Sequence, residues 1–437
     1  MGYLAIIVGF AVLVILCMKN VHVIMASFFA ALSVALIANL PLEESLITTY
    51  FTRFGSIAVS LFPMFLFGSI LAELYTASGA PSTIADKVST ALFTRAKTEK
   101  MKYVYGYLSV IVASAILCYG GGINAAVALI AIYPIALGIF EKANIPKRFI
   151  MGAICGGAFT FALSGPGSPQ PTNVVAMAIG TSSTCGFVAG VIGAIVEIVT
   201  TVVILSTLTV KAKANGECFK LGPKDTMAKP MGNMPSLLSC LLPIVFLLVV
   251  FNILKINISF SIALTAIVAA IIFYPQLKGV GIFKAINCGA AKSLSPIGAI
   301  GTVNGFAAVV QSVPEFQTTI DALIHSSMSP IVMLIGIVAI ICMMTGGSTT
   351  GAQIALPIIA PALKAVGIPL EYVHRVGTYA ATMLDSLPNS GSVVMAVSLA
   401  DLDMKDGYPP VFVSTVVATI LGTIVVALIM TLFPMLP

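Results

Sequence analysis

The sequence predicts an all-α polytopic membrane protein made of two inverted repeats, each with about five transmembrane helices, one broken at mid-membrane, and a re-entrant helical hairpin. The 437 residues are 59% hydrophobic and 9% charged, with a mean hydropathy of +1.08, whereas globular chains are about 25% charged. Apolar runs near the roughly 20 residues that cross a bilayer recur throughout. Two clusters of Gly, Pro, Ser and Asn, at 164–173 and 385–392, interrupt apolar segments.

The first repeat is expected at residues 1–210. Residues 1–18 lack a basic n-region, so they are expected to be a span rather than a signal peptide. Residues 79–95 carry apolar side chains at helical spacing and are expected to form an interfacial helix. The other expected elements are spans at 3–17, 21–40 and 57–75, a short connection at 41–56, a hairpin at 103–141, a broken helix at 149–182 and a returning span at 187–208.

A polar, lysine-rich segment at 211–234 is expected to be a cytoplasmic linker, and the second repeat then occupies 235–437. The same order of elements recurs after it. The expected elements are spans at 237–254 and 261–274, an amphipathic stretch at 279–292, a span at 297–313, an interfacial stretch at 316–326, a hairpin at 330–366 with its tip at 345–353, a broken helix at 375–400 and a last span at 411–433.

Three landmarks support the repeat. Gly-Gly at 121 and 346, Ile-Pro at 145 and 368, and a break proline at 166 and 388 occur in one order, 222 to 225 positions apart. Five crossings per half invert the second half relative to the first. With the linker inside, all but four of the 22 Lys and Arg lie on the cytoplasmic side, which satisfies the positive-inside rule. The four expected outside are Arg53, Lys255, Lys364 and Arg375.

Helix breaks and hairpin tips at membrane depth expose backbone N–H groups, which favour an anion, and carbonyls, which favour a cation. Hydroxyl and amide side chains accompany them, so we expect a small hydroxylated organic anion as substrate. Ser and Thr that only bond backbone carbonyls or allow close helix packing are the alternative. The candidate substrate-binding residues are Asn124, Ser164, Gly165, Gly167, Ser168, Gln170, Asn173, Asn304, Thr349, Thr350, Gln353, Asn389 and Ser390.

Candidate coupling-cation residues overlap with these, and Na⁺ at the same elements is the metal expected. They are Gly121, Gly122, Asn124, Thr172, Asn173, Ser348, Asp385, Ser386 and Asn389. Two acids in apolar surroundings are candidate proton carriers. Asp385 adjoins the second break, where a helix-capping role is the alternative. Glu197 falls within the span 187–208 without an obvious partner, and a structural role as a protonated or paired residue is its alternative.

Four stretches resemble the gluconate permease (GntP-type) family of the ion transporter superfamily. ALSGPGSPQPTN and MLDSLPNSGSVV are similar to the two helix breaks of the branch that includes 3-hydroxybutyrate permeases, TGGSTTGAQIAL to its second hairpin and SGAPSTIAD to its interfacial helix. The resemblance covers nearly the whole chain. Gluconate-type members carry a histidine before the first break, where this chain has Ser164, and the favoured branch has His-Asn where this chain has Asn389 and Ser390.

The resemblance implies uptake of a short hydroxy-monocarboxylate with H⁺ or Na⁺ by an elevator-like homodimer in the bacterial cytoplasmic membrane. No cofactor or nucleic-acid partner is expected, since loop lysines account for the +6 net charge. A gluconate:H⁺ symporter and a sodium-coupled di- or tricarboxylate symporter are the nearest alternatives, although the sequence places no Arg or Lys at the midplane for a second substrate charge. A channel or an intramembrane enzyme is disfavoured, because broken-helix pairs indicate transport and no hydrolase or protease motif occurs.

Overall fold

The computed structural model describes residues 1–19, 21–115, 117–118, 125–168, 171–223, 225, 234–254, 256–279, 281–316, 318 and 329–433. Every regular element within these ranges is a helix. The first half contains α1 (Gly2–Met18), α2 (Val23–Ile37), a π-helical turn (Glu44–Tyr50), α3 (Phe51–Ser78), α4 (Ala80–Leu92), α5 (Glu99–Ala115), α6 (Ala125–Ala143), α7 (Ile150–Phe159), a second π-helical turn (Thr160–Ser164), α8 (Pro171–Ile179) and α9 (Phe187–Ala214).

The second half continues with shorter helices. These are α10 (Leu237–Leu248) with a π-helical turn (Val249–Ile253), α11 (Ile258–Ile272), α12 (Tyr274–Leu277), α13 (Ile282–Lys292), α14 (Leu294–Gln311), α16 (Pro330–Thr345), α17 (Ser348–Ala365), α18 (Leu370–Ala381), α19 (Gly391–Leu399), α20 (Met404–Phe412), a π-helical turn (Val413–Val417) and α21 (Ala418–Leu432). Most of the interfacial stretch expected at 316–326 lies outside the described residues.

The chain is a multi-pass helical membrane protein, as its composition predicts. In the described part, three helical segments are long and apolar enough to cross a bilayer: Glu44–Ser78, Phe187–Ala214 and Met404–Leu432. Shorter apolar helices, including α1, α2 and α16, accompany them. One face of α9 shows why lipid is needed, because Ile195, Val199 and Val203 recur one turn apart and are each 53% exposed.

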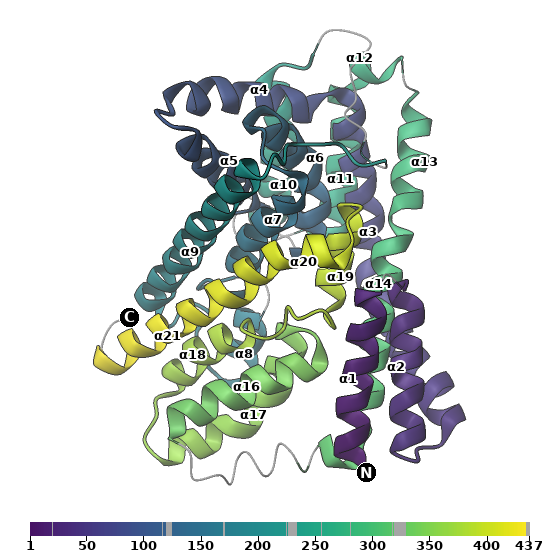
Figure 1. Cartoon of the computed structure of the whole chain (residues 1–437), viewed down its shortest axis with the longest axis vertical. Coiled ribbons are helices and arrows are strands. Elements are labelled where there is room, and N and C mark those ends of the chain that lie inside the picture. Colours follow the sequence, from purple (N-terminus) through teal and green to yellow (C-terminus); the bar gives the residue numbers. More distant parts are fainter. Residues whose placement is uncertain are drawn as a thin grey trace.

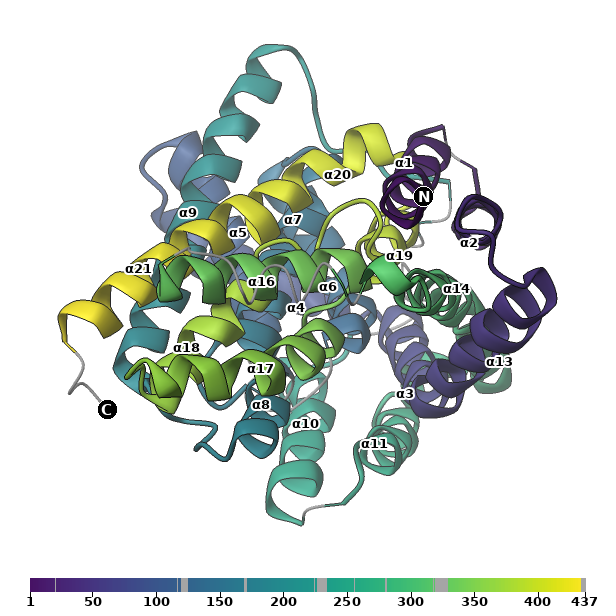
Figure 2. The same cartoon turned by 90° about the horizontal axis from the view of Figure 1, so that it is seen from below.

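The helices form two groups that lie side by side. Figure 1 shows α1, α2, α3, α13 and α14 standing together along one side, while α5 to α9 and α16 to α21 fill the other. The view from below in Figure 2 shows the same separation. Helix α3 packs against α13 and α14 in the upright group, against α6 in the other, and against α11, while α14 packs against α19. Helices α3 and α14 are therefore the boundary between the two groups.

The expected connection at 41–56 is wrong. A π-helical turn begins at Glu44 and runs directly into α3, so one helical segment covers Glu44–Ser78. The partly amphipathic pattern arises because one face of this segment packs on the protein. Tyr50 is 1% exposed, approaches Ser27 Oγ with its hydroxyl at 3.3 Å, and lies against Gly305 of α14.

The amphipathic stretch and the span expected within 279–313 correspond to two consecutive helices, α13 and α14. Helices α13 and α14 are separated by Ser293 alone, which has helical backbone angles. Gly289 makes this possible, because its Cα packs so closely on the backbone of Ser69 and Ile70 in α3 that a Cβ would lie 2.6 Å from Ile70 Cα. Apolar and polar side chains alternate along this stretch because α3 covers one of its faces.

Helices α9 and α21 cross at small residues. A Cβ on Gly193 would lie 2.5 Å from Val426 Cγ2 and 2.8 Å from the ring of Tyr379, and one on Gly422 would lie 2.9 Å from Glu197 Cγ. These distances are shorter than packed carbon atoms allow. Glycine at 193 and 422 therefore sets how closely the two long apolar segments at this crossing approach each other.

We expect Gly193→Val to lower the apparent melting temperature of the detergent-solubilised protein, because overpacking a crossing costs about 1–3 kcal/mol. The matched control is Gly336→Val in α16, where no atom lies within 4 Å of the added Cβ. Thermal unfolding followed by fluorescence compares the two. Equal melting temperatures would contradict a tight crossing at Gly193.

Candidate functional site

The first break lies between α7 and α8, and its own hydroxyl groups bond its backbone. The preceding π-helical turn closes with Gly165 N–H donating to the Thr160 carbonyl at 2.9 Å. Ser168 Oγ lies 2.9 Å from both the Leu163 carbonyl oxygen and Thr172 Oγ1, and Thr172 Oγ1 lies 3.4 Å from the Gly165 carbonyl oxygen. Ser168 and Thr172 are fully buried. A break so bonded can stay irregular in a membrane, where unpaired backbone groups are costly.

Gly167 gives this break its shape. Its φ is +72°, in the left-handed region that side chains disfavour, and its N–H donates to the Ser183 carbonyl at 2.9 Å. Ser183 belongs to the loop between α8 and α9, so the break is fastened to the segment that follows it. Gly165, in contrast, has an extended backbone with a φ of −61°.

Glu197 of α9 has the partner that the sequence did not reveal. Ser164 Oγ donates to Glu197 Oε2 at 2.9 Å, and the glutamate is fully buried. Its Oε1 has no hydrogen-bond partner among the described residues. An ionised carboxylate so enclosed is costly. Glu197 is therefore a buried acid directly beside the first break, bonded through Ser164.

Arg375, which the sequence analysis expects on the outer side of the membrane, is buried against backbone carbonyls that the sequence did not indicate. The side chain is 0% exposed. Its guanidinium donates to the carbonyls of Cys185 at 2.9 Å, Ser183 at 3.1 Å and Ser164 at 3.4 Å. A guanidinium can do this because its N–H donors fan out in one plane and meet several carbonyls at once. A residue of the second half thus bonds the backbone of the first break.

Tyr379, one turn after Arg375 on α18, extends this contact, and it too is absent from the sequence-based candidates. Its hydroxyl donates to the Gly190 carbonyl of α9, and the side chain is fully buried. Gly190 also touches the break, since a Cβ there would lie 3.0 Å from Pro166 Cδ. One feature of the sequence could have identified both residues. Arg375 and Tyr379 are four positions apart, which places them on one face of the helix expected there.

The second hairpin has a much shorter tip than predicted. Helix α16 ends at Thr345 and α17 begins at Ser348, so the joint is Gly346 and Gly347 rather than the whole of 345–353. Gly346 has a φ of +65°, which ends α16 as a left-handed cap. The hydroxyl residues expected at the tip therefore lie on the first turns of α17, where their N–H groups point out of a helix N-terminus.

The second break meets this tip directly. Asn389 Nδ2 donates to the Met343 carbonyl at 2.8 Å, and Ser390 Oγ donates to the Gly346 carbonyl at 3.2 Å. Both side chains are buried, with 4% and 3% exposed. Two candidate residues from one end of the predicted site are thus brought against the hairpin, which lies more than forty positions earlier in the chain.

Asp385 belongs to the second break, between α18 and α19, and its carboxylate lies beside the N-terminus of α17. Ser386 Oγ donates to its Oδ1 at 2.7 Å, and the hydroxyl and backbone N–H of Ser348 also hydrogen-bond the carboxylate. The side chain is 5% exposed. A helix N-terminus stabilises a carboxylate, and Asp385 meets that of α17 from a distant part of the chain, whereas the N-cap residues themselves are Gly347 for α17 and Ser390 for α19.

The two breaks are near each other in the fold. Asp385 and Glu197 lie close enough for their charges to interact. In the second half, Thr419 Oγ1 of α21 donates to the Thr382 carbonyl at 3.2 Å, next to the second break. Each break is thus contacted by the long helix that follows it in its own half. Among the described residues, no group of three His, Cys, Asp or Glu could hold a metal ion.

The remaining candidates are less closely grouped. Asn304 lies half-buried on α14 beside Val303, whose Cγ1 would be 3.6 Å from a Cβ on Gly346. Thr349 and Thr350 are half-buried on the first turn of α17, whereas Gln353 is exposed. The candidates Gly121, Gly122, Asn124 and Gln170, and the side chain of Asn173, lie outside the described residues.

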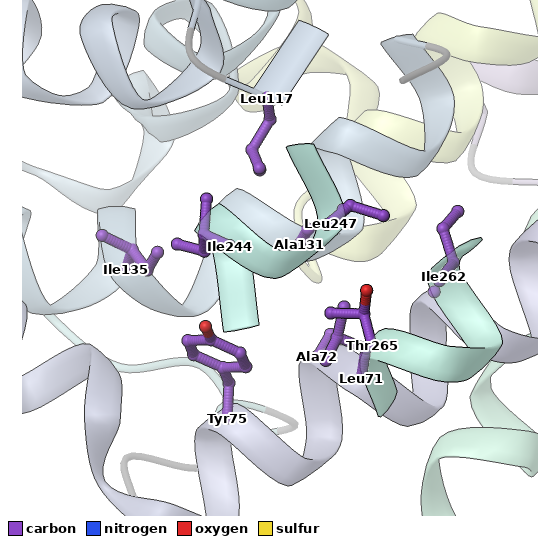
Figure 3. A pocket seen from close by; sticks show the side chains of 11 residues that line it. Leu71, Ala72, Tyr75, Leu117, Ala131, Ile135, Ile244, Leu247, Ile262 and Thr265 are labelled. Carbon is purple, nitrogen blue, oxygen red and sulfur yellow. The ribbon is translucent and has the colours of Figure 1, made fainter. Parts of the chain in front are cut away.

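An apolar cavity elsewhere does not suit a hydroxylated anion. It lies among α3, α6, α10 and α11, measures about 40 Å³, and is lined by side chains such as Leu71, Ile135 and Leu247 (Figure 3). Its two hydroxyl groups are already engaged, with Tyr75 donating to the Cys240 carbonyl and Thr265 to the Ser261 carbonyl. The cavity is a packing gap about large enough for a single water.

No protein-family model matches this chain. Over 409 residues it is 25% identical to the "Uncharacterized transporter YxjC" of Bacillus subtilis (strain 168), and the match covers 82% of this chain and 84% of that protein. A solved structure, the YdaH transporter of Alcanivorax borkumensis, described as having an unusual topology, aligns over 89% of this chain and 88% of its own with a TM-score of 0.39 and 15% identity. A likeness at that level assigns neither fold nor function.

We expect Arg375→Met to destabilise the protein strongly, because the Ser164 carbonyl of the first break and two carbonyls of the loop before α9 lose this donor, at about 1–3 kcal/mol each. The matched control is Arg148→Met, which removes a half-exposed pair with Glu217 (2.8 Å) and should cost less than about 1 kcal/mol. Thermal unfolding in detergent provides the comparison. If both variants melt at the same temperature, Arg375 does not hold the break.

Proposed function

We propose that this protein is a secondary active transporter that couples uptake of a small hydroxy-monocarboxylate, such as 3-hydroxybutyrate, to H⁺ or Na⁺ in the bacterial cytoplasmic membrane. The observation that carries the proposal is the contact between the second break and the second hairpin, made by Asn389 and Ser390. Irregular backbone at membrane depth is typical of substrate and ion sites. The naming of YxjC as a transporter and the resemblance to gluconate permeases add support.

The chemistry of the breaks supports a singly charged, hydroxylated substrate. The first turn of α17 offers N–H groups and the half-buried hydroxyls of Thr349 and Thr350, which suit a carboxylate and a hydroxyl group. The buried Arg375 donates to protein carbonyls, and its guanidinium is thereby occupied. A second substrate charge would need a further cation at the site.

An elevator-like mechanism built on two inverted repeats is part of the same proposal. In each half the long helix after the break bonds the chain beside that break: Ser164 donates to Glu197 of α9, and the Thr382 carbonyl accepts from Thr419 of α21. Positions 197 and 419 are 222 apart, as are the break prolines at 166 and 388. The upright group bounded by α3 and α14 would be the fixed scaffold, and a homodimer formed through it would hold it still while the breaks move.

We expect purified protein in proteoliposomes to accumulate labelled 3-hydroxybutyrate when an inward H⁺ or Na⁺ gradient is imposed. Unlabelled lactate should compete, whereas citrate should compete weakly, because the breaks offer hydroxyls and N–H groups but no second cation. Saturable counterflow would distinguish a transporter from a channel. Accumulation of citrate or gluconate in place of 3-hydroxybutyrate would show that the substrate class is wrong.

We expect Glu197→Gln to reduce gradient-driven uptake by at least about tenfold, while exchange of labelled for unlabelled substrate at equal concentrations persists. The amide keeps the size of the side chain but cannot exchange a proton or hold a cation by charge. Asp86→Asn is the control, because Asp86 lies in a surface ion pair with Lys142 at 2.8 Å. Normal gradient-driven uptake by Glu197→Gln would exclude Glu197 from coupling and direct attention to Asp385.

A further inference from the structure

A second cavity lies at the boundary between the two helix groups, on the linker side of the breaks. It measures about 360 Å³ and is bordered by α3, α6, the end of α19, Asp225 of the linker and Lys292 of α13. This volume is within the range of small-molecule pockets. Unlike the apolar cavity of Figure 3, it brings together hydroxyl groups and charged side chains from elements far apart in the sequence.

The acids around this cavity are neutralised by neighbouring lysines. Asp225 is 2% exposed, lies 2.5 Å from Lys147 Nζ, and accepts a hydrogen bond from the Tyr133 hydroxyl at 2.7 Å. Glu73 and Lys292 form an ion pair at 2.6 Å, with 14% and 52% of their side chains exposed. An ammonium has three donors, so Lys292 can bond Glu73 and an incoming carboxylate together.

Ser69 supplies a polar group that the protein leaves unused. Ser69 is one of the residues that line the cavity, and its Oγ is buried without a hydrogen-bond partner among the described residues. A buried hydroxyl without a partner is costly, and one that faces a cavity can be satisfied by water or a ligand. Thr76, about two helical turns later on α3, also lines the cavity.

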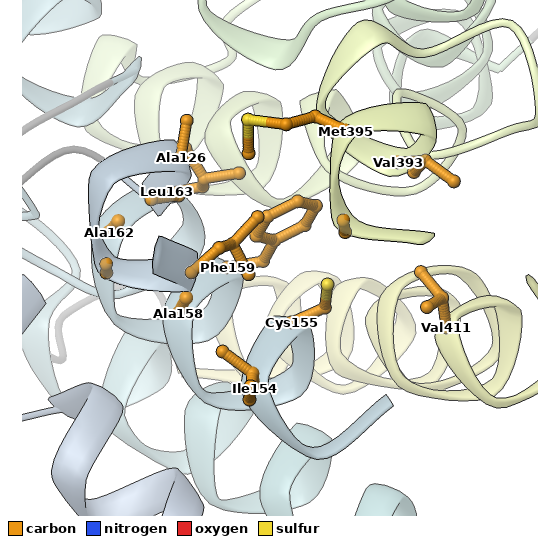
Figure 4. Packing of buried hydrophobic residues seen from close by; sticks show 14 of the residues in the cluster. Ala126, Ile154, Cys155, Ala158, Phe159, Ala162, Leu163, Val393, Met395 and Val411 are labelled. Carbon is orange, nitrogen blue, oxygen red and sulfur yellow. The ribbon is translucent and has the colours of Figure 1, made fainter. Parts of the chain in front are cut away.

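Met395 separates this cavity from the breaks. It lines the cavity, yet its side chain is only 2% exposed. Figure 4 shows Met395 of α19 in the apolar cluster with Ala126 at the start of α6 and Leu163 just before the first break. A methionine side chain is unbranched and adopts several rotamers, so it can move aside without leaving a fixed gap.

We propose that this cavity is an outer binding site for the transported anion on the linker side. Lys292 binds the carboxylate, Ser69 binds the hydroxyl group, and Met395 is the apolar barrier between the cavity and the helix breaks. The inference rests on the proposed function, because the ligand class is taken from the chemistry of the breaks. It adds a site that Lys292 and Ser69 form outside both breaks.

Cysteine labelling tests this site. In inside-out vesicles, a membrane-impermeant methanethiosulfonate reagent should modify Ser69→Cys much faster than Ser78→Cys, and saturating 3-hydroxybutyrate should slow the modification severalfold. Ser78 is the matched control, because it is a buried serine of α3 that does not line the cavity. The native Cys218, exposed in the linker, should react equally with and without substrate. Mass spectrometry assigns the modified residue.

Uptake kinetics provide an independent test. Lys292→Met should raise the concentration of 3-hydroxybutyrate for half-maximal uptake by about tenfold, the equivalent of about 1.4 kcal/mol, with little change in maximal rate. Lys284→Met, which alters an exposed lysine on the same helix, should behave like the wild type. Equal half-maximal concentrations in the two variants would overturn the role of Lys292.

The two proposals fail in different ways. If the wild-type protein takes up 3-hydroxybutyrate but the Ser69→Cys variant is labelled as slowly as Ser78→Cys, or quickly without protection by substrate, the outer site is wrong and the proposed function stands. If the wild-type protein takes up no hydroxy acid, the proposed function is wrong and the outer anion site fails with it. Fast, substrate-protected labelling of the Ser69→Cys variant supports both.

Discussion

A helix break inside a membrane leaves backbone N–H and C=O groups that lipid cannot bond, and the structure around residues 164–173 is arranged to satisfy them. Ser168 and Thr172 bond carbonyls within the break, and Gly167 donates to the loop before α9. The carbonyl of Ser164 and two carbonyls of the loop between α8 and α9 accept hydrogen bonds from Arg375. The guanidinium is a charged donor, and its complete burial makes it costly to leave unbonded.

This arrangement makes the two halves of the chain depend on each other. Arg375 and Tyr379 belong to α18, in the second half, yet they bond the first break and the α9 backbone. Glycines at 190 and 193 let α18 and α21 approach α9 closely enough for these bonds. The first break, α9 and α18 are therefore joined by direct hydrogen bonds between the two halves of the chain.

The two breaks nevertheless differ in chemistry. The first is enclosed by Arg375 and Glu197, and its hydroxyls are engaged with its own backbone. The second has Asp385 at the N-terminus of α17, with Asn389 and Ser390 bonded to the end of α16. A ligand at the second break would therefore be bound by groups of the N-terminal turn of α17. Glu197, beside the first break, is within range of the charge of Asp385 in the second.

The amino-acid sequence by itself determined the class of fold and the position of both breaks, whereas only the tertiary structure decided what contacts those breaks. Apolar runs identify helices because a bilayer demands about 20 apolar residues, and clustered Gly and Pro end helices wherever they occur. Both effects are local, so α1, α2, α9 and the candidates Ser164, Asn389 and Ser390 could be placed from sequence.

The partners of the breaks could not be placed in this way. In the sequence, Arg375 resembles a charge at the outer end of a helix, because the sequence shows its neighbours along the chain but not the carbonyls it bonds, which lie 190 to 211 positions away. The helix at Glu44–Tyr50 was missed for the same reason, since its amphipathic pattern suits a loop until α14 covers it. Local patterns follow from backbone and solvent, whereas these partners depend on how distant helices pack.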